Sequence, residues 1–282
     1  MKGVINSIWN EFVYGGHLLS LGASAILYST VLIFNKPISI PLLVLGYGIN
    51  QVIYTYNHFK EAEKDALTNP ERAKHVKQKK TKILFILYLF LVIVSLIFLQ
   101  DLGTFLFAAF LMAGGIMFTE FFKGLTRKIV GFKTFYASLF WAFLIILSAI
   151  YYNINYIPLI ILLFLFVYLR FVLSIAFFDI KDIESDKRDF LKTFPVLLGR
   201  NKTLSFLHIL NFISILPLVL GVYFKILPTF SLSLCLFYFY SFYYLRQAVS
   251  KSKNIRKLSY IMVDGEYIFW PLILFLSLII FL

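Results

Sequence analysis

Three observations predict an all-α fold, a polytopic membrane bundle of about nine transmembrane helices. First, 60% of the 282 residues are hydrophobic and the mean hydropathy is +0.84, well above the values of soluble globular domains. Second, the apolar residues form continuous runs, whereas a transmembrane β-barrel has short segments of alternating hydrophobicity. Third, these runs are long enough to cross about 30 Å of hydrocarbon as helices.

The predicted spans follow one another along the whole chain, and several begin near a proline, where a helix tolerates one. No polar stretch is long enough for a separate soluble domain, so residues 1–282 are expected to form a single transmembrane domain. We expect the spans at roughly 12–34, 39–57, 82–99, 102–121, 134–152, 156–178, 204–223, 229–247 and 262–282.

Basic residues lie mainly in alternate loops, and this asymmetry predicts the orientation of the chain. Four loops carry most of the lysines and arginines, whereas the loops between them hold only Lys36 and Lys225. Because basic loops tend to stay in the cytoplasm, we predict a cytoplasmic N-terminus and a C-terminus outside. The basic loops are then cytoplasmic caps, at 58–81, 122–133, 179–203 and 248–261.

The net charge of +13 would suggest nucleic acid as the partner of a soluble protein. In a chain of spans it is better explained by topology and by contact with anionic lipid and phosphate. We therefore predict a multi-pass protein of the cell membrane that contacts membrane lipid and no nucleic acid. The single cysteine, Cys235, excludes an intramolecular disulfide and a cysteine metal cluster.

A cluster of three carboxylates follows the sixth predicted span. Asp179, Asp182 and Asp186 are separated by three and four residues, which predicts that they share one face of a helix over two turns. Carboxylates this close repel one another and are costly to desolvate near a membrane, unless a cation lies among them. Such oxygen clusters suit Mg²⁺ carrying phosphates. The alternative is a set of solvated acids in a loop.

A second polar cluster follows the second predicted span. His58, Glu61 and Asp65 repeat the three-then-four spacing, and Asn57, Glu61 and Asp65 lie four residues apart. Both clusters fall on the predicted cytoplasmic side of the membrane. Two matched polar faces in so apolar a chain are suited to hold a metal-bound diphosphate between them.

These two stretches resemble the motifs of the UbiA superfamily of intramembrane prenyltransferases. The first family motif reads Asn-Asp, two residues, Asp, three residues and Asp, and then Pro-x-Arg; this chain has Asn57-His58, Glu61, Asp65 and Pro70-Glu71-Arg72. The second motif is matched by Asp179, Asp182 and Asp186, followed by Lys192-Thr193-Phe194-Pro195 and Leu197-Leu198-Gly199. The first motif is therefore divergent, because His58 and Glu61 replace aspartates.

The resemblance implies an enzyme that transfers a prenyl group from a prenyl diphosphate to a small or lipidic acceptor, commonly an aromatic quinone precursor, with Mg²⁺ as cofactor. It implies Asp65 and Asp182 as catalytic residues. Because Mg²⁺ prefers hard oxygen ligands, His58 is expected to donate a hydrogen bond to a metal ligand or to contact the diphosphate, rather than to bind the metal. Asn57 and Arg72 are expected to bind the substrate. The implied metal ligands are Glu61, Asp65, Asp179, Asp182 and Asp186.

Cations would further stabilise a departing diphosphate. Arg170 is a catalytic candidate, because an intramembrane arginine normally faces a cavity or a partner; the alternative is a side chain that extends to the interface. Asp264 and Glu266 are expected to pair with Arg170 or a loop lysine, or to bind the acceptor. Further substrate-binding candidates, each also a normal topology charge or cap, are Lys123, Lys133, Lys181 and Lys192.

Two other functions stay open from the sequence. One is a protein that only binds or cyclises prenyl lipids, and the other is an ion-coupled transporter. Transporters usually place ionisable groups at mid-span and break helices with glycine or proline. Here the acids lie at span ends, which favours the enzyme. Aromatic side chains would then shield the allylic cation. Tyr54 and Tyr136 are candidates, but aromatic residues as common as these mostly face lipid or serve packing.

Overall fold

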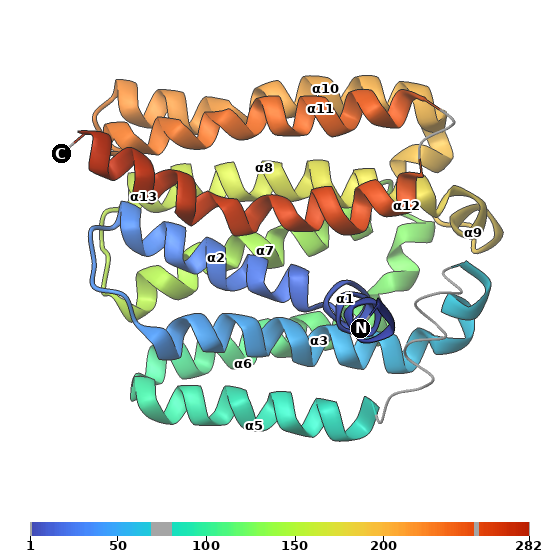
Figure 1. Ribbon diagram of the computed structural model, residues 1–282, viewed down its shortest axis with the longest axis horizontal. Coiled ribbons are helices and arrows are strands. Elements are labelled where there is room, and N and C mark those ends of the chain that lie inside the picture. Colours follow the sequence, from blue (N-terminus) through green and yellow to red (C-terminus); the bar gives the residue numbers. More distant parts are fainter. Residues whose placement is uncertain (1, 69–80, 251–253, 282) are drawn as a thin grey trace.

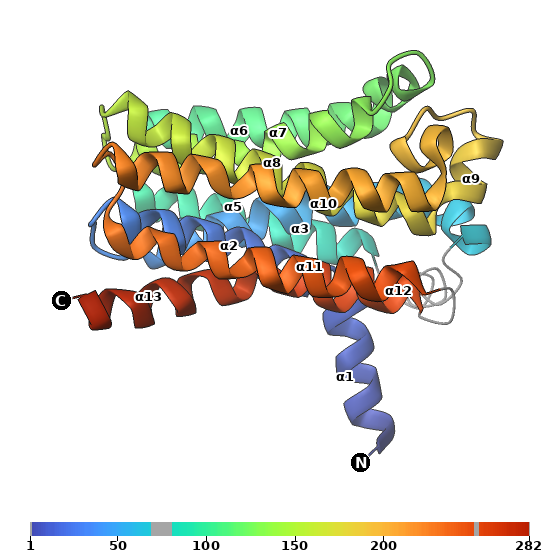
Figure 2. The same cartoon turned by 90° about the horizontal axis from the view of Figure 1, so that it is seen from above.

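The computed structural model describes the backbone of residues 2–68, 81–250 and 254–281, and the side chains of 8–60, 81–250 and 254–280. Within these ranges every regular element is a helix, which confirms the predicted all-α class. The long helices run roughly along one common axis (Figure 1). Seen from above, α1 (Lys2–Tyr14) instead projects from the side of this bundle (Figure 2).

The remaining helices follow in chain order. The first half contains α2 (His17–Ile33), α3 (Ile40–Thr68), α5 (Thr81–Leu99), α6 (Leu102–Met117), the π-helix η1 (Phe118–Phe122), the 3₁₀-helix η2 (Lys123–Arg127) and α7 (Phe132–Tyr151). The second half contains α8 (Ile157–Lys181), α9 (Ile183–Arg188), α10 (Phe194–Tyr223), η3 (Thr229–Cys235), α11 (Leu236–Val249), α12 (Ile255–Lys257), η4 (Leu258–Val263), η5 (Glu266–Ile268) and α13 (Phe269–Phe281).

Six continuous helical stretches in the described part of the chain are long and apolar enough to span a membrane. A seventh results if Ile8–Tyr14 and His17–Ile33, which meet at 61°, count as one broken span. α3 and α11 lie where the second and eighth spans were predicted but are not among these stretches. An integral multi-pass membrane protein is thus confirmed, whereas the exact count of nine is not.

The two ends of the bundle are built differently. At the end that carries the C-terminus, short connections join α2 to α3, α5 to α6, α7 to α8, and α10 to η3 (Figure 1). Each contains one residue in the left-handed region, namely Asn35, Gln100, Asn153 and Lys225, with φ between 51° and 58°. Single left-handed residues let a chain turn tightly out of a helix. The opposite end carries the longer cap segments.

The cap segments at this opposite end are more helical than the sequence suggested. The first predicted loop, 58–81, begins as helix, because α3 continues without a break to Thr68. Residues 69–80 lie outside the described part. The other three caps contain η2, α9, and α12 with η4. Because α3 includes positions 57, 61 and 65, which are four residues apart, these positions lie along one side of the helix.

The core of the bundle is centred on α8, which packs against α7 on one side and α10 on the other. α2 packs against α3 and α13. Small residues allow close packing where helices meet, as is common in membranes. At Gly114 of α6, for example, a β-carbon would lie 2.0 Å from the ring of Phe140 on α7. Side chains of α5 such as Phe90, Ile97 and Phe98 face outward, as expected for contact with lipid.

Candidate active site

A polar cavity of about 290 Å³ opens among α2, α3, α7, α8 and the segment after α12. We call it the polar cavity. Its charged lining comes from Lys133, Asp179, Lys181, Asp182 and Asp264, and its uncharged polar lining includes Asn57, His58, Ser174, Tyr260 and Tyr267. Residues from both predicted motifs, more than 100 positions apart in the chain, therefore line one space.

Asp179 is the most enclosed carboxylate of the second motif. Its side chain is fully buried, and it accepts hydrogen bonds from Lys133 Nζ at 2.7 Å and from Thr134 Oγ1 at 3.3 Å. Both donors come from the first turn of α7, which begins just after Gly131, a glycine in the left-handed conformation (φ 66°). The pairing compensates the burial of the two charges. It also leaves both side chains on the wall of the polar cavity.

Asp182 lies at a break between two helices. α8 ends at Lys181 and α9 begins at Ile183, and Asp182, with φ −104° and ψ 9°, is the residue between them. Its carboxylate contacts Lys181 Nζ at 2.7 Å, and both side chains line the polar cavity. This differs from the prediction of one continuous helical face.

The break at Asp182 changes the position of Asp186. Asp186 is buried on α9 and accepts a hydrogen bond from Thr193 Oγ1 at 3.3 Å, and it is not among the residues that line the polar cavity. The expectation that three aspartates share one face is corrected here, because the chain turns at Asp182. A role for Asp186 in binding metal stays a prediction.

Two residues of the first motif reach the polar cavity from α3. Asn57 Oδ1 accepts a hydrogen bond from Thr119 of η1, and His58 is buried, with its ring centroid 3.9 Å from that of Tyr54. The side chains of Glu61 and Asp65 and the whole of Arg72 lie outside the described residues. By helical spacing, Glu61 and Asp65 continue the side of α3 that Asn57 begins.

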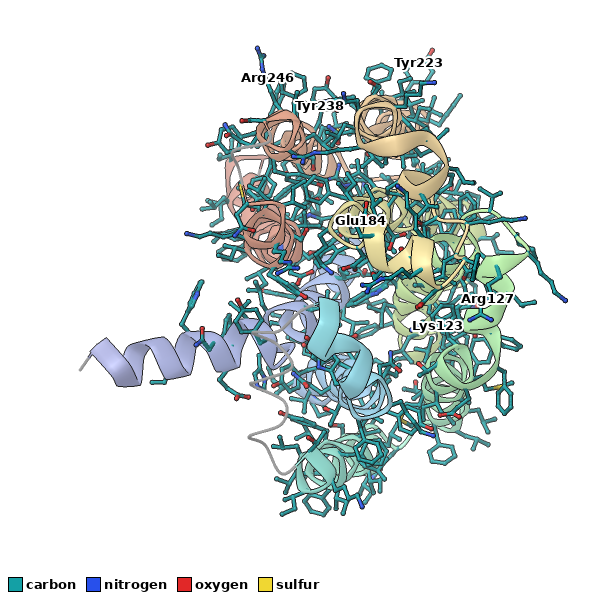
Figure 3. The ribbon with its side chains drawn as sticks, turned by 90° about the vertical axis from the view of Figure 1, so that its right-hand side faces the viewer. Lys123, Arg127, Glu184, Tyr223, Tyr238 and Arg246 are labelled. Carbon is teal, nitrogen blue, oxygen red and sulfur yellow. The ribbon has the colours of Figure 1, made fainter. Side chains whose placement is uncertain are left out.

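The predicted lysines divide into two groups. Lys133 and Lys181 line the polar cavity, whereas Lys123 and Lys192 do not. Lys123 lies on η2, beside Arg127 and on the same end of the bundle as Glu184 of α9 (Figure 3). Lys192 is exposed, and its backbone N–H donates to Thr126 O at 2.9 Å. Lys192 therefore joins the η2 cap to the α9 cap through its main chain.

Arg170 does not line the polar cavity, contrary to the expectation that it faces the site, and a catalytic role for it stays a prediction. Its guanidinium is fully buried and forms an ion pair with Glu266. It also donates to Asn211 Oδ1 at 2.7 Å and to Ser241. Helix rotation turns the side chain toward α10 and α11, away from the polar cavity. The pairing of Arg170 with Glu266, which was one of the sequence-based alternatives, is confirmed.

A second, apolar cavity of about 230 Å³ adjoins the first. We call it the apolar cavity. Five residues line both spaces: Leu19, Tyr54, Asn57, Lys133 and Trp141. Its other walls come from α2, α3, α6 and α7, and include Ala23, Ile49, Leu111, Tyr136, Ala137 and Phe140. The two predicted aromatic candidates, Tyr54 and Tyr136, therefore both line this cavity.

Three aromatic residues that line the polar cavity could not be selected from the sequence: Trp141, Phe171 and Tyr267. Trp141 stacks on Phe171 with ring centroids 4.3 Å apart, and Phe171 stacks on Tyr267 at the same distance. Tyr267 OH lies 2.5 Å from Ser174 Oγ. A serine inside an apolar span was a signal that could have indicated this wall, whereas aromatic residues were too numerous to select.

Within the described side chains, no three histidine, cysteine, aspartate or glutamate residues gather closely enough to hold a metal ion. Two hard carboxylates, Asp179 and Asp182, nevertheless line the polar cavity. Carboxylate oxygens are the usual protein ligands of Mg²⁺, which keeps several of its waters and binds substrate phosphates. The donor set therefore fits a magnesium–diphosphate group.

A sequence profile described as the UbiA prenyltransferase family matches residues 18–270. No individual protein of curated function matches the sequence. Among solved structures, a UbiA homologue from Aeropyrum pernix K1 in its apo form is similar, with a TM-score of 0.71 and 15% identity, covering 93% of this chain and 97% of the other.

Two further structures are similar to this chain. One is a UbiA homologue from Archaeoglobus fulgidus bound to DMAPP and Mg²⁺, with a TM-score of 0.61, 14% identity and coverage of 94% and 98% of the two chains. The other is a digeranylgeranylglyceryl phosphate synthase, with a TM-score of 0.56, 16% identity and coverage of 98% of each chain. Identities this low establish a common fold.

Proposed function

The chain belongs to the UbiA prenyltransferase family, and from that premise we propose that it transfers a prenyl group from a prenyl diphosphate to an acceptor within the membrane. The diphosphate would bind in the polar cavity and the prenyl chain in the apolar cavity. The observation that carries this proposal is the set of side chains common to both spaces. An amphiphilic substrate with one charged and one apolar end needs adjacent spaces of this kind.

The acidic residues of the two motifs would hold Mg²⁺. Asp179 and Asp182 line the polar cavity, and Glu61 and Asp65 would complete the set from α3. The related protein from Archaeoglobus fulgidus, which is bound to DMAPP and Mg²⁺, supports this assignment. When bound, the metal supplies positive charge that stabilises the diphosphate as it departs.

The protein's own cations would assist the same step. Lys133 and Lys181 each pair with one aspartate of the second motif at 2.7 Å, so both could contact phosphate oxygens without moving far. Breaking the allylic C–O bond requires stabilisation of the departing negative charge rather than a protein nucleophile. Positioning these lysines before substrate binds lowers the cost of reorganisation.

The allylic cation would form beside aromatic side chains. Trp141 lines both cavities, and its stack on Phe171 extends the aromatic wall toward Tyr267. Ring faces attract a cation, and an apolar enclosure excludes the water that would quench it. A carbon of the acceptor ring would then form the bond to the carbon that the diphosphate has left, and would lose its proton to the departed diphosphate or to solvent. We propose an aromatic, quinone-precursor acceptor.

We also propose that the end of the bundle with α9 and η2 faces the cytoplasm. The basic segments at this end support that orientation, since Lys123, Arg127 and Lys192 all lie there. The N-terminus would then be cytoplasmic and the C-terminus outside. The soluble diphosphate head group would reach the polar cavity from the cytoplasm.

The direct test is diphosphate release by the purified protein with Mg²⁺, prenyl diphosphates of 5 to 20 carbons and a set of hydroxylated aromatic acceptors. We expect release by the wild type, and loss of about 100-fold or more in Asp182→Asn and Asp65→Asn, as when one group that stabilises a transition state is removed. Glu184→Gln is the matched control, because Glu184 is an exposed acid on α9. Release that is insensitive to both substitutions would exclude this site.

A further inference from the structure

Asp264 occupies an irregular stretch of the last membrane-crossing segment. The π-helix η4 ends at Val263, immediately before it, and the 3₁₀-helix η5 begins at Glu266, two residues after it. Departures from α-helical geometry of this kind occur frequently at functional sites. The backbone therefore carries the Asp264 carboxylate on a local distortion rather than on a regular helical face.

The carboxylate of Asp264 is buried, lines the polar cavity and lacks a partner among the described residues. Its exposure is 8%, and it forms no hydrogen bond or ion pair within the described ranges. Lys181 lies close enough to influence its charge, but Lys181 Nζ already contacts Asp182 at 2.7 Å. Burying a carboxylate costs free energy unless hydrogen-bond donors satisfy it or it takes up a proton. A donor from a ligand in the cavity would meet this requirement.

Glu266 provides the contrast two residues away. It is fully buried as well, but it is paired with Arg170 and accepts from Ser241 Oγ at 3.0 Å. Glu266 is therefore enclosed in a network of hydrogen bonds, whereas Asp264 faces the polar cavity. Packing requirements explain Glu266, whereas they do not explain why a carboxylate occupies position 264.

Two tyrosines that line the polar cavity lie near Asp264 along the chain. Tyr260 and Tyr267 come from the same irregular segment, four residues before and three residues after Asp264, and all three residues line the polar cavity. Tyr267 OH is paired with Ser174 Oγ at 2.5 Å. Asp264 and the two tyrosines bring a carboxylate and two hydroxyl groups to the cavity. Lys181 lies beside them, with its Nζ 5.4 Å from the centroid of the Tyr260 ring.

We propose that Asp264 binds the acceptor. Its carboxylate accepts a hydrogen bond from a hydroxyl group of the acceptor, and the part of the acceptor near Asp264 carries no charge. This inference rests on the proposed function and narrows its substrate class. A carboxylate or phosphate on the acceptor would be repelled by Asp264 in a space of low dielectric. A neutral phenolic hydroxyl would satisfy the carboxylate and leave the rest of the ring free to reach the prenyl carbon.

The test uses purified protein with Mg²⁺, a labelled prenyl diphosphate and three matched acceptors. These are 1,4-dihydroxynaphthalene, its dimethyl ether, and the same diol with a carboxylate at carbon 2. With the wild type we expect prenylation of the neutral diol and little or none of the other two. In Asp264→Asn and Asp264→Ala, the KM for the diol should rise about 10- to 100-fold, as expected for loss of a hydrogen bond to a charged group.

The loss should be specific to the acceptor: in the same variants the KM for the prenyl diphosphate should stay the same or fall, because removing the Asp264 charge removes no contact that is assigned to the diphosphate. The carboxylated diol should become a better substrate relative to the neutral one. Glu184→Gln should match the wild type throughout. The comparison of acceptors on the wild type is a separate readout that does not depend on the folding of any variant.

Two results would overturn the inference while the proposed function stands: diphosphate release with no prenylation of the neutral diol, or prenylation whose KM for the diol is unchanged in Asp264→Asn. Equal use of the diol and its dimethyl ether by the wild type would also contradict it. Absence of diphosphate release from the wild type under all conditions would instead refute the proposed function, and the inference with it.

Discussion

At the scale of single residues, two ion pairs that each contain a buried carboxylate have different surroundings. Lys133 and Asp179 pair at the wall of the polar cavity, where a ligand can reach both. Arg170 and Glu266 pair in the interior, where Asn211, Ser214 and Ser241 provide further hydrogen bonds. The first pair is suited to bind a charged substrate. The second holds α8, α10, α11 and the last span together.

Arg170→Met should therefore affect stability more than chemistry. The substitution leaves Glu266 buried without its partner, and breaking a buried pair on one side typically costs about 3–5 kcal/mol. The double variant Arg170→Met/Glu266→Gln should recover much of this loss, because it removes the unpaired charge. Thermal unfolding in detergent measures both effects. A stable Arg170→Met protein that fails to release diphosphate would show instead that Arg170 acts in catalysis.

Residue identity and spacing predicted Asp179, Asp182, Asn57 and His58 as lining residues, because polar side chains at the ends of apolar spans converge at the membrane surface. The same reasoning failed to place Arg170. Whether an arginine within a span faces a cavity or a neighbouring helix depends on the rotation of that helix about its axis. That rotation is determined by packing against other helices, which sequence spacing does not reveal.

At the scale of elements, the break between α8 and α9 determines which acids share the cavity. The three-then-four spacing of the second motif is compatible with one helix, so the sequence predicted one continuous face. The backbone turn at Asp182 separates Asp179 on α8 from Asp186 on α9. Helix ends are the least certain feature of such predictions, because an acidic stretch fits a helix start as well as a helix interior.

The helix α7 contributes to both cavities and should determine the length of prenyl chain that fits. Ala137 lines the apolar cavity, so Ala137→Phe would fill part of its volume of about 230 Å³. We expect the KM for 20-carbon prenyl diphosphates to rise at least about 10-fold, since overfilling a packed site costs about 1–3 kcal/mol. Activity with a 5-carbon substrate should be retained.

Ala113→Phe is the matched control for Ala137→Phe. Ala113 lies on α6, close in sequence to the lining residue Leu111, but it is exposed on the outer surface of the helix. The Ala113→Phe variant should leave the preference for prenyl chain length unchanged. If Ala137→Phe reduces activity equally with 5-carbon and 20-carbon substrates, the apolar cavity does not hold the chain.

At the scale of the whole molecule, hydropathy predicted the helical membrane bundle and the motifs predicted the family; both are confirmed. The number of spans was harder to predict. α3 contains polar residues such as Asn50, Gln51 and Asn57 within its membrane half, and α11 is short because the 3₁₀-helix η3 replaces its first turns. Of these two helices, α3 lines both cavities and α11 lines neither.

The bundle has a structural end and a candidate functional end. Short turns with left-handed residues close the end that carries the C-terminus, whereas the polar cavity lies toward the end with α9, η2 and the cap of α3. Helices held at one end can present variable caps at the other without loss of the core. This arrangement brings side chains from distant parts of the sequence to one place.

The central claim is that the acids of α3 and those of the α8–α9 junction bind one metal-diphosphate group together. The most direct measurement is an experimental structure of the protein with Mn²⁺ and a thiolodiphosphate analogue of a prenyl diphosphate, in which anomalous scattering locates the metal. We predict Mn²⁺ within about 2.0–2.4 Å of at least one carboxylate oxygen from each motif. These oxygens would come from Asp65 in the first motif and from Asp179 or Asp182 in the second. Metal bound by one motif alone, with the other turned away from the diphosphate, would contradict the account.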